Sequence, residues 1–487
     1  MNLLTLAQAR TILDATLASA RAHGYKPMGV AVVDAAAQLV ICAREGGASA
    51  LRLDIAQGKA GAAVGMGVNT RVLAQRARDL PAFFGAVSTV AAHKFVAQTG
   101  AVLILDPQGD VLGAVGVSGG TGDEDEQIAI AGVAAAGLAP QPCASCRCGV
   151  DVHAHVVPQE LARYRGKSLP ALWPSMAPAP AIAGLCHRHV MISGKNYRTV
   201  SEQCWSVTRR LSDLVELGVA RQAISPMPEL LSYWLEAADA QVLLRDLNEQ
   251  IATMVAESNG ALIGLGAVPL QDIDLAIDEL RYLMQTLGLR GVEIGSHVQG
   301  MALGDPRLAP FFEACAALGA AVFVHGLRPT GMERLVGPAA LEQVLGYPTD
   351  VGLAAASVIT GNVMVRHPTL RMAFSHGGGT LASLLPRLQQ GWSVFAALRE
   401  QLRDSPVKQA RQLYFDTLVY DGATLAYLVQ TFGATQLMLG TDYPFSFHER
   451  HPVQRVTDGG FDPETSAALV HGNAARFLGL TETQAPS

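Results

Sequence analysis

The sequence has few charged residues and no block of one sign. Only 16% of its 487 residues are charged, the formal net charge is -6, and no dense run of lysine and arginine occurs. A nucleic-acid binder is expected to carry a basic patch or stripe, so the sequence gives no support to a nucleic-acid role. Small molecules are the expected partners.

Long hydrophobic runs are also missing. The most apolar stretch, IAIAGVAAAGLA at 128–139, is too short and too rich in alanine to span a bilayer. The opening segment at 1–24 mixes apolar and polar positions, and it lacks the basic segment and uninterrupted apolar stretch of a signal peptide. These absences predict a cytoplasmic protein with no membrane partner.

Cysteine is scarce and odd in number. Seven are present, and three of them lie close together in CASCRC at 143–148. A disulfide framework makes little sense for so large a chain, so reduced thiols near a linker are expected. A small metal clip is the alternative, although no matching second pair of cysteines follows.

Apolar residues, by contrast, make up 49% of the chain, which is enough for more than one core. QPCASCRC at 141–148 separates two regions with different patterns of strand and helix candidates. We predict a linker there between domains at 1–140 and 149–487. In the first domain, two pairs of apolar strands, the second with Pro107 and Gly109 at its turn, alternate with helical segments. This order predicts an α+β fold with a central antiparallel sheet.

The second domain alternates apolar strands with amphipathic helical segments. The strand candidates lie at 149–154, 217–224, 261–268, 289–295, 320–325, 371–376, 413–419 and 436–441. Eight β/α units of this size predict an α/β fold, the (β/α)8 TIM barrel, with an insertion after the first strand. In such a barrel the carboxyl ends of the strands form the face that carries the active site.

Side chains that bind metals or move protons lie at the ends of these strands: His153, His155, His325, His376 and Asp442. Imidazoles with one carboxylate suit Zn²⁺ with a position left for water. The predicted metal ligands are His153, His155, His325 and Asp442. A bound divalent cation lowers the pKa of water to about 7, and this chemistry needs a nearby base. His376 is the candidate base, because imidazole titrates in the right range.

Other histidines are weaker candidates. CHRHV at 186–190 also has an H-x-H spacing, but it falls in the insertion and shows no barrel strand, which favours a lid or a loop. His448 and His451 lie in a segment where solvated side chains are expected. His297 ends the fourth strand candidate and is a secondary candidate for substrate contact.

Beyond the H-x-H pair, the second domain contains GKNYR at 194–198, VPLQDIDLA at 268–276, SHGGGTLASLLPRLQQGW at 375–392, YFDTLV at 414–419 and MLGTDYPF at 438–445. With this ordered set of motifs, residues 149–487 resemble the amidohydrolase superfamily. Within it they resemble the 2-amino-3-carboxymuconate-6-semialdehyde decarboxylase (ACMSD) group. The resemblance implies a zinc-dependent nonoxidative decarboxylase of an unsaturated or aromatic-ring-cleavage carboxylic acid, without an organic cofactor.

The resemblance also implies roles for individual residues. One Zn²⁺, or another divalent metal, would bind to the four predicted ligands, and His376 of the HGGG motif would be the acid/base. Arg198 would hold a substrate carboxylate, and Arg387 would do so across a homodimer interface, since a planar guanidinium suits bidentate binding. Asp151, which precedes the metal histidines, either orients the site or merely caps it.

Two departures from the family pattern bear on the substrate. HGLRP follows the fifth strand and adds Arg328 where Pro-Trp often follows the histidine, and Glu293 stands where an uncharged side chain is familiar. A close alternative keeps the metal but changes the reaction to hydrolysis or hydration of an acidic lactone, amide or enoate. Release of CO₂ distinguishes the two.

In the first domain, VAVVD, LRLDIAQGKA and GAVGVSGGTGDEDEQIA resemble the GlcG/haem-binding-protein-like family. That resemblance implies a domain that binds a small ligand or haem, assists oligomerisation, or acts on the substrate or product of its neighbour. His23 and His93 are conceivable haem ligands. A small-ligand- or haem-binding protein acting through this domain is therefore the alternative from another class, and the complete metal set argues against it.

Overall fold

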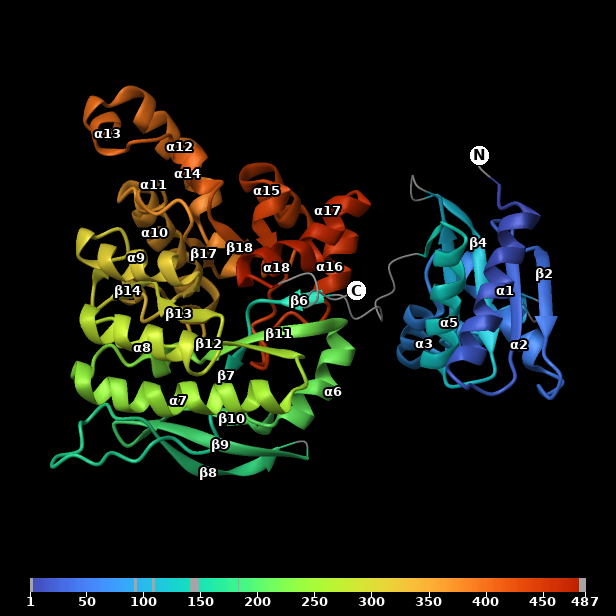
Figure 1. The fold of residues 1–487 in the computed structure, drawn as a ribbon, viewed down its shortest axis with the longest axis horizontal. Coiled ribbons are helices and arrows are strands. Elements are labelled where there is room, and N and C mark those ends of the chain that lie inside the picture. The colour runs from blue at the N-terminus through green and yellow to red at the C-terminus, as the bar shows by residue number, and fades with distance from the viewer. Residues whose placement is uncertain (1–2, 92–93, 107–109, 141–148, 183, 481–487) are drawn as a thin grey trace. The chain divides into compact units, whose positions relative to one another are not determined.

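The computed structural model describes residues 3–91, 94–106, 110–140, 149–182 and 184–480. The chain divides into two units, Met1–Cys146 and Arg147–Ser487 (Figure 1). The linker predicted at 141–148, with the three cysteines of CASCRC, lies outside the described residues. The described cysteines, Cys42, Cys186, Cys204 and Cys315, are all free.

A five-stranded antiparallel sheet is the centre of the first unit, as predicted. Its strands are β1 Gly29–Asp34, β2 Leu39–Arg44, β3 Ala101–Leu105, β4 Val111–Ser118 and β5 Ala139–Pro140, in the order β2-β1-β4-β3-β5. Asp34 shapes the first hairpin turn, where its side chain accepts hydrogen bonds from the backbone N–H groups of Ala36 and Gln38. The second predicted turn, with Pro107 and Gly109, lies outside the described residues.

Helices cover both faces of this sheet. They are α1 Leu6–Ala22, α2 Arg52–Met66, α3 Thr70–Asp79, α4 Pro81–Val90 and α5 Gly122–Ala135. Val30 and Val32 of β1 pack with α1 and α5, whereas Val33 packs with α2, because side chains alternate along a strand. Gly116 of β4 lets α2 approach closely, since a Cβ atom there would lie 2.1 Å from the Ala56 carbonyl oxygen.

An ion pair is buried inside this unit. Lys59 of α2 donates to Asp125 of α5 at 2.8 Å, and both side chains are 2% exposed. Replacing Lys59 by methionine is expected to lower the free energy of unfolding by about 3–5 kcal/mol, because Asp125 then remains as an unpaired buried charge. Urea unfolding measures this loss, and the Lys59→Met/Asp125→Leu double variant should recover most of it. Equal losses in the single and double variants would contradict the electrostatic explanation.

The second unit contains a barrel of parallel strands (Figure 1). Each strand pairs with the next along the chain: β6 Gly149–Asp151, β11 Val219–Pro226, β12 Leu262–Gly266, β13 Gly291–Gly295, β16 Ala321–His325, β17 Arg371–Phe374, β18 Tyr414–Asp416 and β19 Leu437–Met438. Two backbone hydrogen bonds join the first strand region to the last: Val152 N–H to the Leu439 oxygen at 2.9 Å, and His155 N–H to the Tyr443 oxygen at 2.7 Å. The TIM-barrel prediction and all eight strand candidates are confirmed.

The helices of this unit follow the strands and cover the barrel. The longer ones are α6 Val207–Leu217, α7 Ala237–Glu257, α8 Ile273–Gln285, α9 Ala309–Leu318, α10 Tyr347–Thr360, α12 Leu381–Val394 and α15 Gly422–Phe432. The shorter ones are α11 Val363–Arg366, α13 Ala396–Gln401, α14 Pro406–Ala410, α16 Pro452–Asp458, α17 Pro463–Ala467 and α18 Asn473–Leu478. Within the described residues, no helix is both long enough and apolar enough to cross a bilayer.

The insertion after the first strand corrects one prediction. It forms a separate antiparallel sheet of β8 Ser175–Ile182, β9 Leu185–Ile192 and β10 Lys195–Ser201, in the order β10-β9-β8. CHRHV at 186–190 is part of β9, so it is a regular strand and not a loop. These three strands pair with one another and not with the barrel, so the β/α pattern of the barrel did not predict them.

Candidate metal centre and active site

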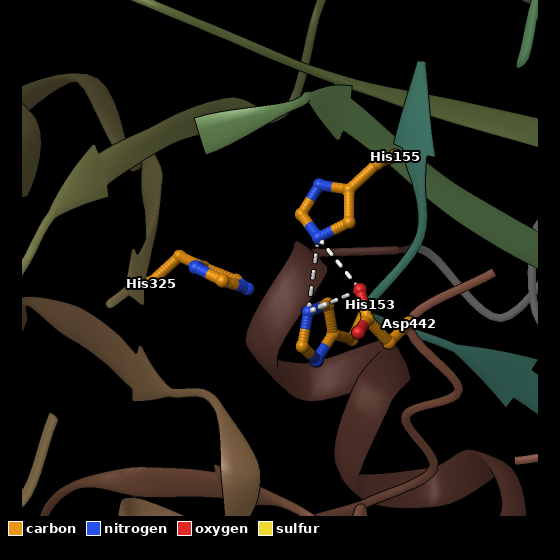
Figure 2. Close-up of side chains that lie close together, drawn as sticks. All are labelled: His153, His155, His325 and Asp442. Carbon is orange, nitrogen blue, oxygen red and sulfur yellow. Dashed lines mark hydrogen bonds and ion pairs between the residues drawn. The ribbon is translucent and has the colours of Figure 1, made fainter. Parts of the chain in front are cut away.

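Four of the predicted site residues converge at the carboxyl ends of the barrel strands (Figure 2). His153 follows β6, His155 begins β7 His155–Val156, His325 ends β16 and Asp442 follows β19. One ligand atom from each lies within 4.8 Å of the others, and the three histidines are buried. Closure of the barrel brings these groups together although they come from opposite ends of the unit.

Each of these histidines uses Nδ1 for a protein partner. The acceptors are the Asp416 carboxylate for His153 at 2.7 Å, the Pro226 carbonyl for His155 at 3.1 Å, and the Gly326 carbonyl for His325 at 2.8 Å. With the proton on Nδ1, the Nε2 atom of each ring presents a lone pair. Metal-binding histidines are held in this way, with one nitrogen on a protein acceptor and the other on the ion.

The Nε2 lone pairs of these three histidines are suited to binding a cation. Nε2 of His153 lies 3.1 Å from Nε2 of His155, and neither atom then has a proton to donate. Nε2 of His325 is buried and has no hydrogen-bond partner among the described residues. Leaving a buried acceptor unpaired is costly, and a divalent metal ion would remove that cost. Imidazole nitrogens with a carboxylate are a donor set that suits Zn²⁺.

Asp442 completes this donor set. Its Oδ1 lies 3.2 Å from Nε2 of His155 and 3.7 Å from Nε2 of His153. Burial alone raises the pKa of Asp442, but the two histidines lower the pKa below its ordinary value, so the side chain is an anion at neutral pH. Its backbone is in the left-handed region with φ 63° and donates to the His153 carbonyl oxygen at 2.8 Å. This unusual conformation aims the carboxylate at the histidines.

His376 lies beside the four ligands without joining them. Its ring centroid is 5.0 Å from that of His325 and 5.4 Å from that of His153. Burial, with His153 nearby, lowers the pKa of His376 to about 4, so the imidazole is neutral at pH 7. The sequence predicts a ring that titrates in the ordinary imidazole range, and burial moves the pKa below that range. The HGGG motif is needed for the turn, because a Cβ atom at Gly379 would lie 1.7 Å from the Pro348 carbonyl oxygen.

A cavity of about 350 Å³ opens onto these groups, a size suited to a small molecule. Its lining includes His155, His325, His376, Asp442, Arg198, Tyr197, Glu229, Tyr347, Tyr420 and Phe445. Arg198 comes from β10, and its guanidinium lies 4.5 Å from the centroid of the Phe445 ring. The insertion sheet therefore supplies a cation to the cavity wall.

Comparison with family models identifies the families that the two parts of the chain match. Residues 150–480, more than half of the chain, match the model described as amidohydrolase. The chain belongs to the amidohydrolase family. Residues 4–134 match the model described as haem degrading protein HbpS-like. Both resemblances seen in the sequence are confirmed.

The amidohydrolase unit is similar to proteins named as decarboxylases. It is 35% identical over 333 residues to the 2-amino-3-carboxymuconate-6-semialdehyde decarboxylase of Dictyostelium discoideum, which covers 68% of this chain and 91% of the relative. The solved structure of IDCase from Metarhizium anisopliae matches with a TM-score of 0.59 and 22% identity, over 70% of this chain and 99% of that chain. A dihydroxybenzoic acid decarboxylase from Polaromonas sp. JS666, solved with bound manganese, matches with a TM-score of 0.52 and 19% identity, over 57% of this chain and 87% of that chain. At these identities the two solved structures show the fold.

The amidohydrolase site contains a carboxylate that the sequence prediction missed. Asp416, the last residue of β18, accepts from Nδ1 of His153 at 2.7 Å and from the backbone N–H groups of His376 at 3.0 Å and Gly377 at 2.7 Å. Asp416 thus holds one metal histidine and the backbone of the candidate base at once. A signal was present, because Asp416 lies in YFDTLV at a strand end like the other site residues.

Replacing Asp416 by alanine is expected to lower the affinity for the metal about 10–100-fold, because the ring of His153 loses the partner that fixes its orientation and tautomer. Competition with a chromophoric chelator measures this affinity. Asp421→Ala is the matched control, since Asp421 is an exposed aspartate that accepts from the N–H of Thr424 at the start of α15. An unchanged affinity in Asp416→Ala would contradict the orienting role.

Asp151, whose role the sequence left open, lies behind the metal ligands. It accepts from the backbone N–H of His153 at 3.0 Å, the hydroxyl of Thr441 at 2.6 Å and the amide of Gln222 at 2.8 Å. The fully buried Arg210 in turn donates to Gln222 at 2.6 Å. Asp151 therefore orients the backbone around two of the metal ligands.

Arg387 and His297 lie elsewhere in the amidohydrolase. Arg387 is exposed on α12, outside the residues that line the described cavity. His297 begins the short hairpin strand β14 His297–Val298 instead of ending a barrel strand, and its Nε2 lies 3.3 Å from the Arg328 carbonyl oxygen.

His448 and His451, the other candidates in the second unit, are not among the four converging residues. His451 is exposed as expected, but His448 is half-buried against the ring of Tyr443 at a centroid distance of 5.6 Å. In the first unit, His23 is exposed and stacks on Tyr25 at 5.3 Å, and His93 lies outside the described residues.

The two departures from the family pattern lie just behind the cavity wall. Glu293 is fully buried, with a carboxylate oxygen 3.6 Å from Nδ1 of His155, and its hydrogen bond comes from Ser225. Arg328 pairs with the cavity residue Glu229. Both departures therefore act on the site through a neighbouring residue.

Proposed function

We propose that this amidohydrolase is a metal-dependent, nonoxidative decarboxylase of an unsaturated or aromatic-ring-cleavage carboxylic acid, of the ACMSD type. The observation that carries the proposal is the convergence of three Nε2 atoms and the Asp442 carboxylate beside His376, in a cavity that also contains Arg198. The names of the relatives, including the Dictyostelium decarboxylase, support the choice of reaction.

In this proposal Arg198 binds a carboxylate of the substrate through a bidentate guanidinium contact and so fixes the orientation of the acid. His376 takes up a proton from water, which leaves hydroxide in solution, and delivers that proton to the carbon that bears the departing carboxylate. The carbon–carbon bond breaks, a carbon–hydrogen bond forms, and CO₂ leaves. A metal held by His153, His155, His325 and Asp442 would polarise the substrate and stabilise developing negative charge.

Three finer assignments are part of the same proposal. The metal is Zn²⁺, for which the nitrogen and oxygen donors are suited. The enzyme is a homodimer, in which Arg387 of a second copy contacts the substrate carboxylate, and the exposure of Arg387 on α12 is compatible with this. Its location is the cytoplasm, as the sequence predicted.

Freshly generated 2-amino-3-carboxymuconate-6-semialdehyde tests the function. Zinc-reconstituted full-length protein should remove its absorbance and release one CO₂ per substrate, and the His376→Ala variant should not. Consumption of the substrate without CO₂ would contradict decarboxylation and favour hydrolysis or hydration. If the compound is left intact, the same CO₂ assay is repeated with other ring-cleavage acids.

A further inference from the structure

An acidic side chain lines the cavity that we assign to an acidic substrate. Glu229 lies in a short 3-10 helix, Pro228–Leu231, that follows β11, and it borders the same space as Arg198 and the metal ligands. Its side chain is only 7% exposed. A buried carboxylate is costly unless it is paired and hydrogen-bonded.

Arg328 holds this carboxylate by one of its two oxygens. Nε of Arg328 donates to Oε1 of Glu229 at 3.0 Å, and Nη2 donates to the same oxygen. The guanidinium also lies over Trp234, with its central carbon 3.3 Å from the centroid of the ring, and this cation–π contact favours the position of Arg328. No hydrogen bond from the described residues reaches Oε2 of Glu229.

The charges around Glu229 divide the cavity into two kinds of subsite. Arg198 offers a cation to a substrate carboxylate, whereas Glu229 offers an acceptor and repels a second carboxylate. Burial raises the pKa of Glu229, and the adjacent Arg328 opposes that rise. A group that donates a hydrogen bond is the natural ligand of the remaining oxygen.

We propose that Glu229 is a specificity residue whose Oε2 accepts a hydrogen bond from a hydroxyl or amino group of the substrate. Glu229 then selects, among the acids of the proposed function, a substrate whose donor group reaches Oε2. The substrate carboxylate lies toward Arg198 and the metal, and the donor group lies toward Glu229. This inference rests on the proposed function, because it uses the same cavity and the same carboxylate contact.

The expected discrimination is at least tenfold. A site that contains a buried polar group rejects an analogue that lacks the matching donor, since the protein group is then left without a partner. Hydroxybenzoates and fluorobenzoates are suitable probes, because fluorine is small but donates no hydrogen bond. The 2-, 3- and 4-substituted pairs test each position of the donor.

Isothermal titration of the zinc-loaded full-length protein with these six acids measures the effect. For at least one position, the hydroxy acid should bind at least tenfold more tightly than the fluoro acid. This ratio should fall to within about threefold in Glu229→Leu, whereas Arg198→Leu should weaken both members of the pair alike. Glu257→Leu is the matched control, since Glu257 is an exposed acidic residue at the end of α7 that does not line the cavity.

A double variant separates the effect of losing Glu229 from the effect of leaving Arg328 unpaired. Glu229→Leu leaves Arg328 without its partner, so the Glu229→Leu/Arg328→Leu double variant, which removes both charges, is measured beside it. The inference is overturned if the acids bind but the hydroxy-to-fluoro ratio is the same in wild type and in both variants. If no acid binds to the wild type, the carboxylate contact of the proposed function fails, and the inference fails with it.

Discussion

Replacing His376 by alanine is expected to slow the release of CO₂ about 10²–10⁴-fold, the range typical for loss of a general acid or base. The neutral ring of His376 lies beside the metal ligands and borders the cavity, so its removal takes away the group that moves the proton. The rate is measured by trapping CO₂ under saturating substrate. Metal content should stay the same, because His376 is not one of the four ligands.

A second histidine provides the control for this result. His451 is exposed and does not line the cavity, so His451→Ala should keep the wild-type rate. Full activity in His376→Ala would contradict the catalytic role.

Removing the metal should abolish activity. Protein treated with a chelator is expected to show no CO₂ release above background, and one equivalent of Zn²⁺ per chain should restore it, because the charge stabilisation that decarboxylation needs comes from the ion. In Asp442→Ala the same addition should not restore activity, since one of the four converging ligand atoms is gone. The metal should also raise the melting temperature of the wild type, because it binds only the folded site.

Asp462→Ala is the control for the ligand variant. Asp462 is an exposed aspartate that caps α17, where it accepts from the N–H of Thr465 at 2.8 Å. It is not one of the four converging ligands. Its activity should respond to chelation and zinc as the wild type does. Unchanged activity in chelated wild-type protein with no bound metal would contradict the whole metal proposal.

The positions of the four converging side chains followed from sequence because the barrel rule is simple. Apolar runs of strand length located eight strands, and polar residues at the strand ends located the four converging ligands and His376. Asp416 has the same place at the end of β18, but YFDTLV gave no prediction of a role for this residue. The sequence cannot show which residue Asp416 contacts, because its partner His153 is 263 positions away in the chain.

The insertion shows the opposite situation. Strands β8, β9 and β10 pair only with each other. Neither the β/α repeat of the barrel nor the H-x-H spacing at 186–190 therefore predicted these strands. Arg198 was identified by resemblance alone, and its place in the cavity wall depends on how that sheet packs.

The sequence by itself determined the fold class and the chemical type of the site, because both depend on local patterns: alternation, helical spacing, and polar residues at strand ends. Tertiary structure alone decided which nitrogen of each histidine is free, that Asp151 orients backbone instead of binding metal, and that Glu229 borders the cavity with one oxygen held by Arg328. These features depend on hydrogen bonds between residues far apart in the chain. Only the closed barrel and its packed loops bring such partners within bonding distance.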